Sequence, residues 1–188
     1  MEPLEIVAQV LGALNALEIP YMIVGSLSSN VYGDPRFTKD ADFVVQLGDR
    51  PLSALMQNLG PDFKVDRQLG FETVTGTNRY HLVHVPTDFL IELFELTNEP
   101  HNQARFTRKR STPFAGTVAF FPTAEDVIIQ KLRWYHKAKR PKDLQDLQNV
   151  LEMQEGNLDM PYIRQWCQQH GTLELLEKTI ASIPPLPD

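Results

Sequence analysis

Two short apolar runs, separated by a polar stretch, constrain the fold of this chain more than any other feature. The first, Tyr21–Val24, ends at Gly25-Ser26, and the second is the apolar part of a strand expected over 41–47. Short continuous apolar runs are typical of strands that are covered on both faces. Residues 26–32 predict a short helix that begins directly after the first strand. The pattern therefore predicts a strand–helix–strand unit with polar residues at the ends of both strands.

The rest of the chain predicts an α/β half followed by a helical half. A hairpin signal at Gly76-Thr77-Asn78 lies among closely spaced strands, which favours a small mixed sheet over a doubly wound parallel one. We expect an α/β (α+β) core over 1–121, a helical part over 122–182 and a proline-rich tail over 183–188. Further strands are expected at 71–75, 80–85, 89–96 and 117–121, and helices at 3–18, 51–59 (with Asp49 as N-cap), 123–136, 141–153, 161–169 and 173–180.

Composition limits the classes of protein to which the chain can belong. Its 188 residues are 42% hydrophobic, enough for one packed domain with a helical appendix. The net charge of −6 argues against a nucleic-acid binder held by bulk charge, and no DNA-specific motif is present. Cys167 is the sole cysteine, the N-terminus carries no basic leader, and no apolar run is long enough to span a bilayer. These features predict a cytoplasmic protein without a membrane partner.

Charge is unevenly distributed along the chain. Residues 105–110 and 131–142 hold ten of the eighteen basic residues and no acidic residue. Such a segregation allows a polyanion to bind at one place on an acidic protein, and equally describes two solvated basic surfaces. Trp134 and Tyr135, within the second stretch, would suit stacking on an RNA end.

The strongest chemical signal is the pair Asp40 and Asp42 at the start of the second strand. Residues two apart on a strand point to one face, so the two carboxylates lie side by side and repel each other. A divalent cation relieves this repulsion, and Mg²⁺ takes carboxylate oxygens together with substrate phosphates. Gly25 and Ser26 supply a close backbone approach, a hydroxyl and a helix N-terminus, which together suit a phosphate.

A third carboxylate is expected on a neighbouring strand, where Asp88 and Glu92 are the candidates. Glu92 lies within an apolar run, where an acid is costly unless it is paired or binds a metal, so we favour it over Asp88. His81, three residues before His84 on another predicted strand, is interpreted as an ordinary strand histidine.

The motif of Gly25-Ser26 followed by Arg36-x-Thr38-x-Asp40-x-Asp42 resembles the signature of the DNA polymerase β-like nucleotidyltransferase superfamily. More narrowly, it resembles the minimal bacterial branch with the AbiEii-type toxins of toxin–antitoxin systems. Residues 125–132 and 142–147 are similar to the helical segment of that branch. The resemblance covers about residues 20–150. It implies a small mixed sheet flanked by helices and a helical C-terminal part.

The resemblance also implies an activity and a set of roles. A nucleoside monophosphate would pass from an NTP such as ATP to an acceptor hydroxyl on RNA or protein, with release of pyrophosphate and with two Mg²⁺ or Mn²⁺ ions. Asp40, Asp42 and Glu92 would bind metal, although the family usually has Asp at the third position. Gly25, Ser26, Arg36, Thr38, Lys131 and Asp143 would form the nucleotide site, with Lys131 near the phosphates and Asp143 at its rim.

Two alternative functions remain open at this point. The Glu at position 92 favours a catalytically weak nucleotide-binding or antitoxin-like module of the same fold. A metal-dependent nuclease also uses clustered acids, but the sequence lacks a second dense cluster of acids or histidines. A toxin, antitoxin or housekeeping role is compatible with the same residues, and so is an antitoxin protein as partner.

Overall fold

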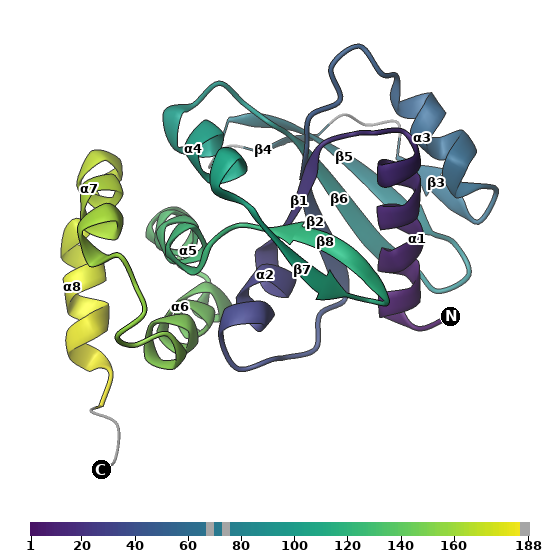
Figure 1. Ribbon diagram of the computed structural model, residues 1–188. Helices are drawn as coiled ribbons and strands as arrows, with labels where there is room; N and C mark the ends of the chain where they lie inside the picture. Colours follow the sequence, from purple (N-terminus) through teal and green to yellow (C-terminus); the bar gives the residue numbers. More distant parts are fainter. Residues whose placement is uncertain (67–69, 73–75, 185–188) are drawn as a thin grey trace. The chain divides into compact units, whose positions relative to one another are not determined.

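The computed structural model describes residues 1–66, 70–72 and 76–184, which form two compact units (Figure 1). The first unit comprises Met1–Leu27 and Phe37–Pro122, and the second comprises Ser28–Arg36 and Thr123–Asp188. The sequence assigned residues 28–36 to the α/β core, whereas the structure groups them with the helical residues. Tyr32 packs on the helical core, and its carbonyl accepts a hydrogen bond from Gln154.

The first unit is built on a mixed sheet, as the sequence predicted. Strand order is β1 (Tyr21–Val24), β2 (Asp40–Val45), β6 (Phe89–Glu95), β5 (Thr77–His84) and β3 (Phe63–Val65), with β4 (Gly70–Glu72) also paired to β5. β2 and β6 run parallel, and the other pairs in this sheet are antiparallel. Residues 73–75, part of the expected hairpin, lie outside the described residues.

Helices and a hairpin cover the apolar centre of this sheet. α1 (Pro3–Ala16) buries Ile6, Val10 and Leu14 and contacts α3 (Leu52–Leu59). The hairpin β7 (Arg110–Phe114) and β8 (Thr117–Phe121) packs against β1, where the rings of Tyr21 and Phe120 meet edge to face (Figure 1). All four residues of β1 are buried, which explains their continuous apolar pattern.

Two sequence predictions for this unit are corrected, and three elements were not expected. The N-cap of α3 is Pro51 and not Asp49. Residues 105–110 do not form a fully solvated basic surface, because Arg105 is buried and belongs to α4 (Pro100–Arg108). Neither α4 nor β3 was expected, and β7 was also missed.

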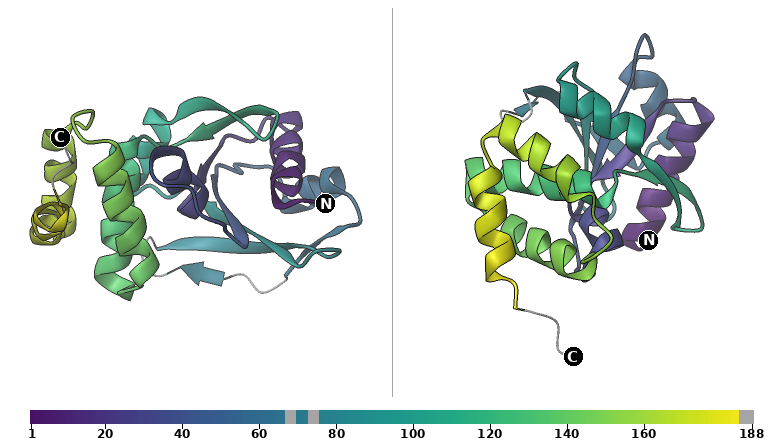
Figure 2. Two further views of the ribbon diagram at one scale, coloured as in Figure 1. Left: turned by 90° about the horizontal axis from the view of Figure 1, so that it is seen from below. Right: turned by 60° about the vertical axis from the view of Figure 1, so that its left-hand side comes forward.

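The second unit is helical and has its own core. Its long helices are α5 (Ala124–Ala138), α6 (Pro141–Met153), α7 (Met160–His170) and α8 (Leu173–Ser182), which lie as two adjoining pairs in Figure 2. Thr123 caps α5 by accepting a hydrogen bond from the Asp126 amide, as its position predicted. The core contains Ile128, Leu147 and Cys167, each buried.

Helix α2 (Gly25–Tyr32) belongs to both units, since its first three residues group with the sheet and the rest with the helices. Within the described residues, no helix combines the length and apolar character needed to cross a membrane. Of the predicted tail, residues 185–188 lie outside the described part of the chain.

Candidate active site

The parallel pairing of β2 with β6 brings carboxylates together on one face of the sheet. Asp42 is registered opposite Glu92, and Asp40 is registered opposite Leu90. Residues directly opposite each other on paired strands share a face, and so do residues two apart on one strand. Asp40, Asp42 and Glu92 therefore share a face, and all three side chains are half-buried.

The register also separates the two candidates for the third carboxylate. Asp88 precedes β6, is exposed, and adopts a left-handed backbone conformation with φ of 55°. Glu92 lies within β6, one strand away from Asp42. The structure thus places Glu92 beside the aspartate strand, while Asp88 lies in the turn that leads into β6.

Gly25 lies so close to Asp42 that no side chain fits between them. Gly25 begins α2 with φ of +63°, and a Cβ atom added there would overlap the Oδ2 atom of Asp42. Val24, the residue before it, is registered opposite Asp42 in the β1–β2 ladder. The N-terminus of α2, with the buried Ser26, therefore begins directly beside the carboxylate.

Asp40 is positioned by the residue two places before it. Thr38 Oγ1 donates a hydrogen bond of 2.6 Å to Asp40 Oδ1. This local bond orients the carboxylate at the entrance of the strand. Thr38, which the family resemblance placed in the nucleotide site, thus acts on Asp40 in the structure.

Two residues of β5 contact Glu92. Arg79 was not singled out by the sequence, and His81 was interpreted there as an ordinary strand histidine. His81 is registered opposite Glu92, with its Nε2 atom 2.8 Å from Glu92 Oε1. Arg79 Nη1 lies 3.2 Å from the same oxygen. From the sequence, the alternation of residues along a strand could have indicated that Arg79 and His81 share a face. Their contact with Glu92 follows only from the pairing register of β5 and β6.

The donor atoms on this face fit a hard divalent cation. Asp40, Asp42 and Glu92 offer carboxylate oxygens, which are the ligands that Mg²⁺ prefers. Among residues 1–66, 70–72 and 76–184, no three His, Cys, Asp or Glu side chains already converge on one point as a metal site. Glu92 is held by contacts with β5. The carboxylates share one face of the sheet but do not surround a single point.

The second unit holds its own cluster of charged residues. Arg36 binds Asp146 through two hydrogen bonds, Nε to Oδ1 at 2.7 Å and Nη2 to Oδ2 at 2.9 Å. Lys131 Nζ lies 2.6 Å from Asp146 Oδ2 and 3.2 Å from Asp143 Oδ1. Arg140 Nε donates to the other oxygen of Asp143 at 2.7 Å. Three cations thus surround two carboxylates.

Burial and charge act in opposite directions on Asp146. Burial raises the pKa of this carboxyl, but hydrogen bonds and charge from Arg36 and Lys131 outweigh it, so the pKa is lowered overall. Lys131 itself is only 7% exposed. A role for Lys131 near the phosphates of a nucleotide is a proposal that must accommodate its two aspartate contacts.

Solved structures with this fold have descriptions that point to one class of enzyme. The antibiotic-resistance factor ANT(2'')-Ia matches with a TM-score of 0.63 and 14% identity, over 93% of this chain and 96% of that one. An antigenic nucleotidyltransferase-like protein from Paracoccidioides brasiliensis gives 0.56 and 21%, over 97% and 94%. The lincosamide antibiotic adenylyltransferase LnuA gives 0.53 and 12%, over 79% and 96%. At these identities the similarity establishes the nucleotidyltransferase fold.

The family itself follows from the sequence. The family described as the nucleotidyl transferase AbiEii toxin of type IV toxin–antitoxin systems matches residues 25–187. The chain belongs to this family and is a nucleotidyltransferase, as the motif around Gly25 and Asp42 predicted. A comparison with curated proteins finds no match.

Proposed function

We propose that this chain transfers a nucleoside monophosphate from an NTP, such as ATP, to a hydroxyl group on an RNA end or a protein. The acceptor oxygen forms a bond to the α-phosphorus, the bond from that phosphorus to the β-phosphate oxygen breaks, and pyrophosphate leaves. The observation that carries this proposal is the shared sheet face of Asp40, Asp42 and Glu92 beside the start of α2.

Asp40, Asp42 and Glu92 would hold two Mg²⁺ ions, with Mn²⁺ as the alternative metal. Such ions would neutralise charge on the attacking and leaving oxygens during transfer. Thr38 fixes the orientation of Asp40 through its 2.6 Å hydrogen bond. Glu92 also offers a carboxylate on this face for the proton that the acceptor hydroxyl loses. Glu has one methylene group more than the Asp that is usual at this position. Two residues on β5 hold this longer side chain in place.

The first turn of α2 would bind the triphosphate. Gly25 allows the backbone to approach a phosphate closely, and Ser26 adds a hydroxyl donor. Arg36, Lys131 and Asp143, which belong to the second unit, are proposed separately as nucleotide-binding residues. Because Lys131 and Arg36 share Asp146 within a cluster of net positive charge, each can contribute positive potential while it stays bound to a carboxylate.

Arg79 and His81 would act as positioning residues for Glu92. Both approach the same oxygen, Oε1, which leaves Oε2 as the oxygen that can face a ligand. Loss of His81 would lower the turnover number more than the NTP affinity, since the triphosphate is assigned to other residues. His81→Gln, which preserves a donor, would retain more activity than His81→Ala, whereas a merely structural histidine would change stability alone.

The family places the chain in toxin–antitoxin systems, so we further propose that it works as a toxin in the cytoplasm and that an antitoxin protein opposes it. The basic residues of 131–142, with Trp134 and Tyr135 among them, support an RNA acceptor over a protein acceptor.

The test incubates the full chain with each α-labelled NTP, Mg²⁺, total RNA and cell extract. The same reaction is run with the Asp40→Asn/Asp42→Asn double variant, and with Asp88→Asn as a matched control for loss of one carboxylate. We expect label to move onto RNA with the wild type and with Asp88→Asn, and not with the double variant.

The outcomes separate the proposal from its competitors. Label that moves onto protein would correct the acceptor. If no label is transferred but calorimetry still detects NTP binding, the proposed transfer reaction is wrong. A nucleotide-binding or antitoxin-like module then remains. Cleavage of RNA with Mg²⁺ and no nucleotide would instead indicate a nuclease.

A further inference from the structure

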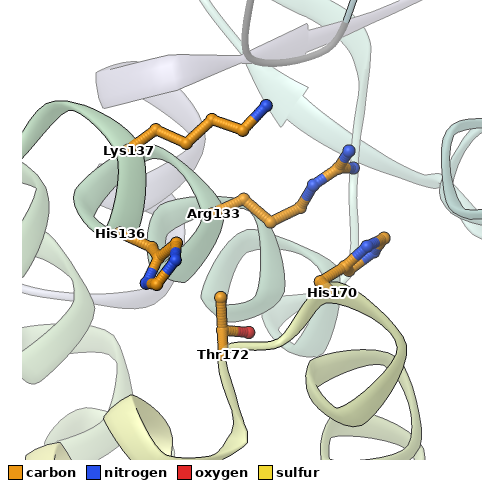
Figure 3. Close-up of a pocket in the computed structure, with 5 residues that line it drawn as sticks. All are labelled: Arg133, His136, Lys137, His170 and Thr172. Atoms are coloured by element: carbon orange, nitrogen blue, oxygen red, sulfur yellow. The ribbon is translucent and has the colours of Figure 1, made fainter.

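A pocket in the second unit is lined by residues that lie outside the proposed nucleotide site. Its lining consists of Arg133, His136 and Lys137 from α5, with His170 and Thr172 from the junction of α7 and α8 (Figure 3). Figure 3 shows Arg133 and Lys137 extending in the same direction from α5, with His170 coming from the neighbouring helix end. All five residues belong to the second unit.

The chemistry of this lining is that of an anion site. Arg133 and Lys137 carry positive charge, both histidines offer ring N–H donors, and Thr172 contributes a hydroxyl group. None of the lining residues is acidic, although the chain as a whole carries a charge of −6. The ring of His170 is stacked on Trp166 at 5.8 Å and an interplanar angle of 19°, which holds its orientation.

The start of α8 adds to the positive potential of the pocket. Thr172 is the N-cap of this ten-residue helix, and its side chain makes no capping hydrogen bond. Its hydroxyl lies 3.5 Å from the Cys167 carbonyl instead. A helix N-terminus has a partial positive charge and backbone N–H groups that favour anions.

The size of the pocket limits what can enter it. Its volume of about 190 Å³ is smaller than the ~300–1,000 Å³ that is typical of sites for whole drug-sized ligands. A phosphate group fits within such a volume, while a complete nucleotide does not. The remainder of a phosphorylated ligand would stay outside, near the exposed side chains of His136 and Lys137.

We propose that this pocket binds a single phosphate group of a larger ligand, and that Arg133 and Lys137 supply the two charged contacts. The ligand class is a phosphate ester, either a terminal monoester of a small molecule or a backbone diester of a nucleic acid. The pocket shares no residue with the proposed nucleotide site, so phosphate binding there does not depend on the transfer reaction. Its α5 residues belong to the basic stretch 131–142, and the proposal of a nucleic-acid diester therefore rests on the proposed RNA acceptor.

A simpler role for these residues is to stabilise the helices that carry them. His136 and Lys137 lie in the last turn of α5, and His170 lies in the last turn of α7, where cations interact favourably with the helix dipole. That role predicts a change in stability upon substitution and no saturable binding of phosphate. The two roles are therefore distinguishable by experiment.

The test follows the ring signals of the five histidines by NMR while inorganic phosphate is added to the full chain at constant ionic strength. We expect saturable shifts at His136 and His170. His81, which contacts Glu92, reports separately on any binding at the proposed active site. Lys137→Gln should weaken the phosphate response about tenfold, since it removes one charge-assisted contact.

Lys139→Gln is the matched control, because Lys139 is exposed, ends the same helix and does not line the pocket. It should leave the phosphate affinity within about twofold of the wild type. Lys137 is exposed, so its substitution is compatible with folding. Absence of a saturable shift at His136 and His170, or an equal response in wild type and Lys137→Gln, overturns the proposal.

A second arm identifies the source of the phosphate group. A nucleoside monophosphate and a single-stranded oligonucleotide with internal phosphates only are titrated separately. Stronger binding of the monophosphate indicates a terminal monoester, and stronger binding of the oligonucleotide indicates a backbone diester. Failure of both probes to shift His136 and His170 would contradict the proposal even if inorganic phosphate binds.

Discussion

The two units hold their carboxylates in opposite ways. On the sheet face of the first unit, Asp40, Asp42 and Glu92 remain half-buried at strand positions where neighbouring residues are apolar. In the second unit, Asp143 and Asp146 are 1% and 3% exposed, and Arg36, Lys131 and Arg140 neutralise them. The first set of acids keeps access to solvent, although Glu92 also contacts Arg79 and His81, and the second set is enclosed with its counter-ions.

We infer from this difference that the acids of the sheet face serve the proposed chemistry and that Asp146 serves the fold. A buried ion pair with several hydrogen bonds is strongly destabilised when one partner is removed, because the remaining charge stays buried. Partly exposed acids that crowd one face gain little stability from their arrangement, and their repulsion favours a bound cation. Substitutions of the sheet-face acids should therefore affect activity, and substitution of Asp146 should affect stability.

The largest effect is expected from Asp42→Asn. This change keeps the shape of the side chain and removes the charge that would hold the metal ions. We expect transferase activity to fall by about 10²–10³-fold or more, with the melting temperature nearly unchanged. Activity is measured by release of pyrophosphate. Asp88→Asn is the control. Equal losses of transferase activity in both variants would show that an acid on the sheet face is no more important for the reaction than an acid in the turn.

Asp146→Ala should have the next largest effect, but on stability. Arg36 and Lys131 would lose their shared partner, and Lys131 would stay buried with Asp143 alone. We expect a loss of about 3 kcal/mol in the free energy of unfolding, measured by urea denaturation. Glu177→Ala, which breaks the exposed pair with Arg164 in the same unit, should change little. Similar losses in the two variants would contradict the comparison.

Gly25→Ala tests the contact between α2 and Asp42. Alanine at φ of +63° is strained by about 1–2 kcal/mol, and its Cβ atom would displace the Asp42 carboxylate. Gly48→Ala has the same kind of strain, at φ of +58°, with nothing within 4 Å of the added atom. We expect similar melting temperatures for both variants and a transferase loss of at least about tenfold for Gly25→Ala alone. Equal activities would show that the position of Asp42 does not matter.

Acid should weaken the second unit through Asp146. The pKa of this carboxyl is lowered from its ordinary value of 3.8, so its ionised form stabilises the folded state. That contribution is complete above pH 3.8 and is lost as the pH falls through the lower folded value. The stability difference between wild type and Asp146→Asn should therefore shrink below pH 3.8 in acid titrations followed by circular dichroism. A constant difference down to pH 2 would count against this ion pair.

Sequence patterns predicted strands and helices in both units but not the side-chain contacts within them. The apolar runs predicted β1 and β2, and the helix expected at 141–153 has the bounds of α6. Helix α4 was missed because His101, Asn102 and Arg105, which it buries, are polar and leave no apolar period. β3 has only three residues, and β7 contains Pro113, which weakens any strand signal.

The candidate site could be predicted where its residues are neighbours in the sequence. Gly25-Ser26 and Asp40-x-Asp42 carry local signals, so the sequence singled them out. The link from His81 to Glu92 depends on the β5–β6 register, and that from Arg36 to Asp146 joins residues 110 positions apart. Without the family resemblance, Asp143 and Asp146 would have been interpreted as a solvated helix face, although both are buried.

The native protein is expected to show very little reactivity at Cys167. Burial raises the pKa of this thiol to about 11, and the side chain lies in the core of the second unit. At pH 8 the thiol should therefore react with a disulfide reagent only when that unit opens, so the labelling rate measures the opening equilibrium. Asp146→Ala should increase this rate by about 100-fold if opening of the unit follows its loss of stability. Asp42→Asn should leave the rate unchanged, because its acid belongs to the other unit. Equal acceleration by both variants would mean that the two units open together. Only activity measurements could then separate the acids proposed for catalysis from those that stabilise the fold.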